Sequence, residues 1–265
     1  MNIFWIEMKA YTKSLIFWSI GILFLIASSM GKYAGLSSTG QSMSDLMEGM
    51  PKALQAIMGI GTLDLSKASG YYGVIFIYLV LMGTIHATML GANIIAKEER
   101  DKTAEFLFVK PVSRNKVILS KFMAALANLV IFNIVSLVTS ISLVTKYSKG
   151  ESVSGDIAIT LAGMFILQLL FLVIGSATAA VNKNPKKAAS LSTAILLITY
   201  ILSIAIDLND KFENLKYLSP FKYFEAKNMM YGGGLEAVYL ILSVSLIVVL
   251  TVVTFVCFKK RDLRL

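Results

Sequence analysis

Few residues in this sequence are able to carry out covalent or metal chemistry. The chain contains one histidine, His86, and one cysteine, Cys257. A metal site needs several His, Cys, Asp or Glu ligands, and nucleophilic catalysis needs a base beside the nucleophile. No stretch matches GxxxxGK[ST], the loop that cradles nucleotide phosphates. We therefore expect neither a membrane enzyme nor a nucleotide hydrolase, and no metal or cofactor held by this chain.

Five histidine, asparagine and glutamine side chains fall inside long apolar stretches, where water cannot satisfy them. They are His86, Asn93, Asn128, Asn133 and Gln168. Polar groups in lipid must find partners within the protein. His86 is flanked by Thr84 and Thr88, so we expect it to be hydrogen-bonded within a helix bundle rather than to relay protons. The amides either line a polar path or tie helices together, and the sequence leaves both roles open.

A charged segment between two apolar stretches is joined to a short apolar ridge. Residues 97–114 read KEERDKTAEFLFVKPVSR. Glu98 and Lys102 stand at i,i+4 in the order that favours a helix. The ridge, residues 106–109, is poorly suited to water, so we expect a short helix over residues 97–112 that presents it to a partner's groove. A helix lying on the lipid surface is the alternative.

The elements that must position these residues are membrane helices. The 265-residue chain is 56% hydrophobic and 15% charged, with a mean hydropathy of +0.72, whereas soluble domains carry about 25% charged residues. No Asp or Glu lies inside its long apolar stretches, and all four prolines fall between them. We predict a single all-α transmembrane domain over residues 1–265. Its six spans, each long enough to cross a ~30 Å hydrocarbon core, are residues 14–30, 72–96, 117–145, 157–181, 188–206 and 237–258.

The net charge of +9 is distributed as a membrane topology requires. With both termini cytoplasmic, the inner segments hold 16 basic and six acidic residues. The outer segments then hold nine basic and ten acidic residues, although they are longer. Because lysine and arginine favour the cytoplasmic side, we expect both termini to be cytoplasmic. The same distribution argues against a nucleic acid as the partner.

Further segments are predicted to lie at the membrane surface. Residues 1–13 mix the apolar Phe4 and Trp5 with charged side chains, which is typical of an amphipathic interfacial helix. On the outer side, residues 207–235 carry aromatic side chains around Pro220, and aromatic rings anchor well at an interface. We expect short outer-side helices there and in residues 41–60.

In this order the segments resemble the permease subunits of type-2 ATP-binding-cassette (ABC-2) exporters, and the likeness covers nearly the whole chain. Residues 97–114, with acidic residues, a short apolar ridge and then Pro-Val-Ser-Arg, are similar to the family's coupling helix. Residues 1–13 are similar to its connecting helix, residues 218–224 to its outer Pro-Phe segment and residues 258–263 to its basic ending. The resemblance implies that Phe4 and Trp5 brace the coupling helix. It implies ATPase-coupling roles for Glu98, Glu99, Glu105, Phe106, Leu107, Phe108, Val109, Pro111 and Arg114.

The resemblance also implies the partners and the reaction. Two six-span permeases pair, as two copies of this chain or with a paralogue, and two cytoplasmic ATPase subunits bind below them and hold ATP and Mg²⁺. Because we expect no buried charge along the path, an amphipathic or hydrophobic export substrate is favoured, such as a peptide, an antibiotic or a lipid-like molecule. We place the protein in a bacterial plasma membrane. Ion-gradient-driven secondary transport and ATP-driven sodium extrusion are the alternatives.

Overall fold

The computed structural model describes residues 3–38, 49–51, 55, 63–103, 112–148, 150–182 and 184–260. Within these residues, six helices are long and apolar enough to cross a membrane. They are α1 (Ile3–Ser38), α4 (Ala68–Arg100), α6 (Arg114–Tyr147), α7 (Ser154–Val181), α8 (Pro185–Leu208) and α10 (Ala237–Lys260). The predicted all-α membrane fold is confirmed. Most of residues 41–60 lie outside the described residues.

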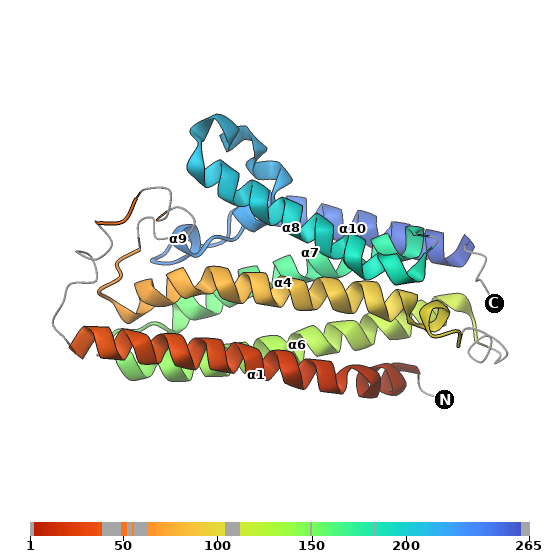
Figure 1. Cartoon of the computed structure of the whole chain (residues 1–265), viewed down its shortest axis with the longest axis horizontal. Coiled ribbons are helices and arrows are strands. Elements are labelled where there is room, and N and C mark those ends of the chain that lie inside the picture. The colour runs from red at the N-terminus through yellow and green to blue at the C-terminus, as the bar shows by residue number, and fades with distance from the viewer. Residues whose placement is uncertain are drawn as a thin grey trace.

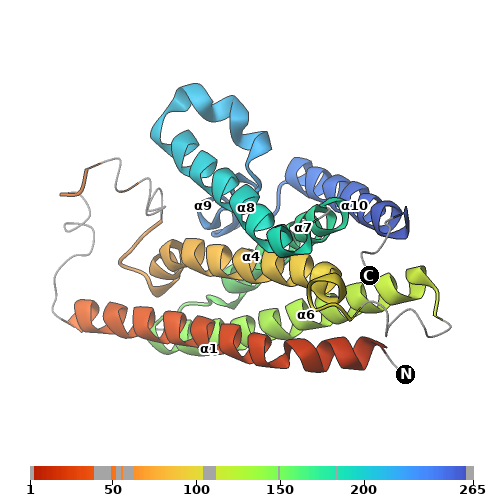
Figure 2. The same ribbon diagram turned by 45° about the vertical axis from the view of Figure 1, so that its right-hand side comes forward.

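The helices form an elongated bundle with both termini at one end (Figure 1). We call this the terminal end, and the opposite end, which carries α9, the far end. The centre is formed by α4 and α7. In the most apolar 18-residue stretch of each helix, 67% of the residues of α4 and 61% of those of α7 are buried, against 11% for α10. On one side α1 packs mainly against α6, and on the other α8 and α10 pack on the central pair (Figure 2).

Glycines set the close approach of the two central helices. A Cβ atom on Gly91 would lie 2.1 Å from the carbonyl oxygen of Leu172, and one on Gly175 would lie 2.4 Å from that of Thr88. The hydroxyl of Ser176 lies in the same seam and donates to the Leu172 carbonyl at 2.8 Å. Small residues at such positions let helix backbones meet. Gly91 of α4 and Gly175 of α7 therefore serve helix packing within this chain.

The first helix is longer than predicted. We expected an interfacial helix over residues 1–13 that is separate from a span at residues 14–30, but α1 is continuous from Ile3 to Ser38. Residues 3–20 contain neither proline nor glycine, so the backbone has no reason to break between the two segments. Residues 3–13 therefore extend the first membrane helix along the bundle.

Residues 207–235, which we predicted to lie on the outer side and which we call the outer segment, contain the predicted short helices: η1 (Asp210–Leu218), η2 (Pro220–Lys222) and α9 (Ala226–Met229). This segment folds back onto the bundle through aromatic rings. The ring centroid of Phe221 lies 5.1 Å from that of Phe171 in α7 and 5.2 Å from that of Tyr200 in α8. Tyr223 stacks on Tyr239 of α10 at 4.9 Å. These contacts fasten the outer segment to three of the six long helices.

Candidate functional site

Four charged side chains, three of them buried and one half-buried, form a cluster at the terminal end, which we call the terminal ion cluster. At its centre is Lys121 of α6, with its Nζ 2.7 Å from both carboxylate oxygens of Glu98 in α4 and 3.4 Å from Glu7 Oε1 in α1. Lys97 completes it, with its Nζ 2.8 Å from Glu7 Oε2. The side chain of Lys121 is 0% exposed and that of Glu7 3%. Two ammonium groups thus balance two carboxylates, and this balance offsets the penalty of burying ions.

Helix geometry explains why these charges point inward. Glu7 lies one turn from Ile3 and two turns from Leu15, and both are buried on the same face of α1. Lys121 shares the buried face of α6 with Val117 and Ala124. From the sequence we counted both charges among those of the inner segments and did not predict that they are buried. Their apolar neighbours one turn away are the signal that could have placed them inside.

The C-terminus of α4 closes in a tight turn directly beyond this cluster. The N–H of Thr103 donates to the Glu98 carbonyl at 2.8 Å, and the N–H of Lys102 donates to the Glu99 carbonyl at 3.4 Å, a Schellman pattern. Lys102 has a φ of 56°, in the left-handed region that this pattern needs. We predicted one helix over residues 97–112. Residues 97–100 instead form the last turn of α4. The Glu98 side chain binds Lys121 of α6 and does not pair with Lys102 as we predicted.

Part of the predicted coupling set falls in the described structure. Glu98 is 9% exposed and bound within the bundle, so in this conformation it is not available to a partner chain. Arg114 donates from Nη1 to the Lys259 carbonyl at 2.9 Å, which ties the start of α6 to the end of α10. Phe4 is half-buried and meets Trp5 edge-on at 5.3 Å, while Trp5 is 66% exposed. The following residues lie outside the described residues: Glu105, Phe106, Leu107, Phe108, Val109 and Pro111.

The amides of the apolar stretches make contacts within and between helices. Asn133 of α6 donates to the side-chain oxygen of Gln168 in α7. Asn128 donates to the α6 backbone at 2.9 Å and contacts the sulfur of Met8 in α1 at 3.2 Å. Asn93 accepts a hydrogen bond of 2.7 Å from Arg100, in the last turn of α4. The Asn133 and Asn128 contacts join α6 to α7 and to α1, whereas the Asn93 contact stays within α4.

His86 lies between aromatic rings at mid-bundle. Its ring centroid is 5.6 Å from that of Trp18 in α1 and 5.0 Å from that of Phe132 in α6. Within the described part of the chain, its buried Nδ1 has no hydrogen-bond partner. We expected a hydrogen-bonded histidine, whereas the flanking Thr84 and Thr88 donate to the backbone of α4 itself. The ring therefore acts here as a packing element between three helices.

The terminal ion cluster connects three helices of the bundle. Among the described residues, no group of three or more His, Cys, Asp or Glu could hold a metal ion. This cluster joins α1, α4 and α6 close to the end of α4 at Arg100 and the start of α6 at Arg114.

The comparisons with known proteins agree with this architecture. The family model described as ABC-2 family transporter protein matches residues 1–263. The chain belongs to this ABC-2 family. A comparison with curated proteins finds no significant match. As an ABC-2 permease, the protein is a multi-pass membrane component of an ABC transporter, and the family in general implies an ABC ATPase partner.

Proposed function

We propose that this permease is the membrane-spanning subunit of an ATP-driven exporter. Two separate ATPase subunits bind at its terminal end and hold the ATP and Mg²⁺. Two permeases, identical or paralogous, pair in the plasma membrane of a bacterium. Family membership supports the transport role, and the excess of basic residues in the segments at the terminal end supports a cytoplasmic position for that end.

The observation that carries this proposal is the terminal ion cluster. Helix α4 ends at Arg100 and α6 begins at Arg114, so an ATPase that moves the residues between them displaces the ends of both helices. Lys121 binds Glu98 of α4 and Glu7 of α1, so the displacement extends to a third helix. Nucleotide binding in another chain can in this way bias two conformations of the bundle.

An amphipathic or hydrophobic substrate is supported by the surface between α6 and α7. A groove of about 290 Å³ there has one polar residue, Asn133, in an otherwise apolar lining. Such a surface suits a peptide, an antibiotic or a lipid-like molecule better than a small ion. The remaining lining residues are Val130, Ile134, Leu137, Ala158, Leu161, Ala162 and Phe165.

The coupling role is tested by replacing Phe106 and Phe108 with aspartate. We expect the double variant to lose its co-purifying ATPase, because two carboxylates cannot enter an apolar groove without a large desolvation penalty. Phe212→Asp is the matched control, since Phe212 is 43% exposed in η1 of the outer segment, and it should retain the ATPase. Assembly and ATP-driven transport by the Phe106/Phe108 variant at the wild-type level would refute the coupling role.

Reconstituted vesicles distinguish the proposed reaction from its alternatives. With the ATPase present, ATP-dependent movement of an amphipathic peptide or drug is the expected result. ATP-dependent movement of sodium without any peptide or drug would instead establish a sodium extruder. Transport driven by an ion gradient, at full rate and without the ATPase, would establish a secondary transporter.

A further inference from the structure

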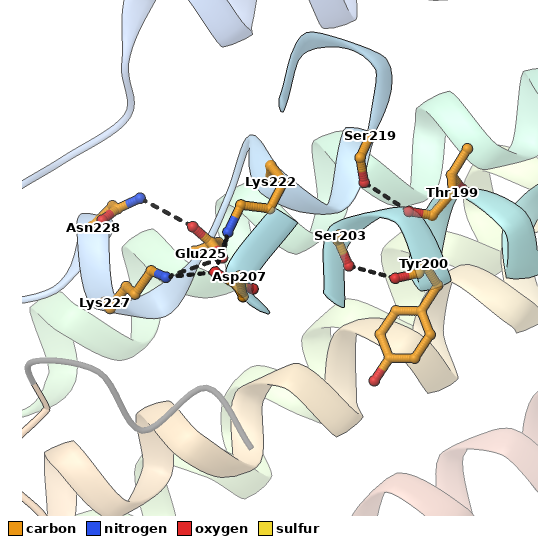
Figure 3. A network of polar contacts seen from close by, with 9 residues as sticks. All are labelled: Thr199, Tyr200, Ser203, Asp207, Ser219, Lys222, Glu225, Lys227 and Asn228. Atoms are coloured by element: carbon orange, nitrogen blue, oxygen red, sulfur yellow. Dashed lines mark hydrogen bonds and ion pairs between the residues drawn. The ribbon is translucent and has the colours of Figure 1, made fainter. Parts of the chain in front are cut away.

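The charged side chains where α8 meets the outer segment satisfy one another. The Nζ of Lys222 lies 2.7 Å from Asp207 Oδ1, and that of Lys227 lies 3.3 Å from the same oxygen. Glu225 contacts both lysines and also accepts a hydrogen bond from Asn228. Figure 3 shows these side chains converging from α8 and the outer segment. Two ammonium groups balance two carboxylates, so this cluster fastens the outer segment to α8 and its charges are paired.

Two amide side chains at mid-bundle are not satisfied in this way. Asn133 of α6 uses both hydrogens of its amide nitrogen, since Nδ2 donates to the Leu129 carbonyl at 2.8 Å and to Gln168 Oε1. Its buried Oδ1 has no hydrogen-bond partner among the described residues. Gln168 of α7 is 0% exposed, and its Nε2 is likewise without a partner in the described part of the chain. This amide pair therefore keeps one unused acceptor and one unused donor group.

The amide pair lies at the groove between α6 and α7, which we call the amide groove. Asn133 lines this groove, and Gln168 lies one turn beyond Phe165, another lining residue. The Gln168 Nε2 atom faces α4, where a Cβ atom on Gly83 would lie 2.4 Å away. Asn133 therefore carries the unused atom on the groove side. The other described residues with a buried, unpartnered polar atom do not line the groove: Tyr11, His86, Asn128 and Ser243.

An unused acceptor beside an apolar groove favours a ligand with a hydrogen-bond donor. A buried oxygen without a partner is costly, and a ligand that donates to it removes that cost. Asn133 Oδ1 is covered in this conformation, and rotation about the Cβ–Cγ bond, a broad torsion in asparagine, turns it toward the groove.

The donor distinguishes between the classes of apolar ligand. Acyl chains and ester groups have neither N–H nor O–H, so a lipid tail would fill the groove without satisfying Asn133. The peptide bond of an apolar peptide supplies an N–H, and its flanking side chains suit an apolar wall that includes Val130 and Leu161. A peptide therefore meets both requirements of the amide groove.

We propose that the amide groove binds an apolar peptide, with a main-chain N–H of the peptide donating to Asn133 Oδ1. The inference rests on the proposed function, in that it narrows an amphipathic or hydrophobic substrate to a peptide. A lipid-like molecule or an antibiotic without such a donor binds less tightly, because it leaves the Asn133 oxygen unpaired.

The test compares three small probes on the purified, full-length permease in lipid nanodiscs. N-Hexylacetamide has one peptide-like N–H, hexyl acetate has an ester oxygen in its place, and N-hexyl-N-methylacetamide has a methyl group instead of the hydrogen. Isothermal titration calorimetry measures binding, and titration into empty nanodiscs corrects for partition into lipid. We expect N-hexylacetamide to bind about fivefold more tightly than the other two probes, the effect of one hydrogen bond. Equal affinities for all three would overturn the proposal.

Variants of Asn133 and of a second amide separate recognition from packing. Asn133→Leu removes the acceptor and should abolish the fivefold preference while the affinity for hexyl acetate stays unchanged. Asn128→Leu is the matched control, because Asn128 lies on the same helix and has its own unpartnered oxygen outside the groove, and it should keep the preference. A preference that survives Asn133→Leu would overturn the site. If that variant fails to fold, the three probes on the wild-type permease still decide.

A second pair of variants tests whether the probes occupy the groove. Ala162→Phe fills it and should weaken binding of all three probes. Val138→Phe adds the same ring at a position of α6 that is 59% exposed and outside the groove, and it should not weaken binding. Wild-type affinities in Ala162→Phe would place the probes elsewhere and overturn the site.

These measurements use the permease without its ATPase. Their failure would therefore reject the peptide site and leave the proposed coupling to an ATPase standing. Failure of the ATPase to co-purify with the wild-type permease would reject the proposed function whatever the calorimetry shows.

Discussion

Replacing Lys121 with methionine tests whether the terminal ion cluster holds three helices together. At 2.7 Å, two unit charges attract by ~6 kcal/mol at an effective dielectric constant of ~20, and desolvation of the ions offsets much of that energy. Removing one partner of a buried pair destabilises a protein by ~3–5 kcal/mol. We expect ~3 kcal/mol here, because Glu7 keeps Lys97 at 2.8 Å and the Glu98 side chain is 12% exposed.

The assay is thermal unfolding of the detergent-solubilised permease. A loss of ~3 kcal/mol corresponds to a melting temperature lower by about 6–12 °C for a domain of this size. Lys116→Met is the control, because Lys116 lies on the exposed face of the same helix. It should change stability by less than ~0.5 kcal/mol.

A double variant distinguishes the ion pair from a general packing effect. Adding Glu98→Leu to Lys121→Met removes both partners, and replacing a buried pair with apolar side chains is often neutral. We therefore expect the double variant to recover more than half of the lost melting temperature. Lys121→Met melting like the wild type, or a double variant whose loss equals the sum of the single losses, would refute the reasoning.

Two further predictions use the same unfolding measurement. Gly91→Ala should lower stability by ~1–3 kcal/mol through overpacking, because its Cβ would lie 2.1 Å from the α7 backbone, whereas Gly31→Ala, with nothing within 4 Å, should keep or raise it. Equal melting of both variants would contradict the close contact. Burial lowers the pKa of Lys227, but the carboxylates of Glu225 and Asp207 raise it more, so the net pKa lies above the ordinary value. The stability that this lysine contributes is therefore present below pH ~10.4 and lost as the pH rises through the raised pKa. Lys227→Met should flatten that alkaline loss, and an unchanged alkaline slope would count against the pairing.

The amino-acid sequence by itself determined the membrane helices. Length and apolar content are local properties, so α4, α6, α7, α8 and α10 begin and end within four residues of the predicted bounds. The order of the surface segments was enough to indicate the ABC-2 family, which the match over residues 1–263 shows. The first helix was mispredicted because the charges of residues 1–13 were interpreted as a surface segment, although nothing there interrupts a helix.

Only the tertiary structure decided which charges are buried and what they bind. Glu7, Glu98 and Lys121 lie near the ends of apolar stretches and are far apart in the sequence, and their burial depends on which helix faces meet. The same holds for Asp207 and Lys222 at the far end, which meet because the outer segment folds back onto α8. Hydrophobic periodicity fixes the inward face of one helix, but the partner of a buried charge is set by contacts between helices, and those exist only in the folded bundle.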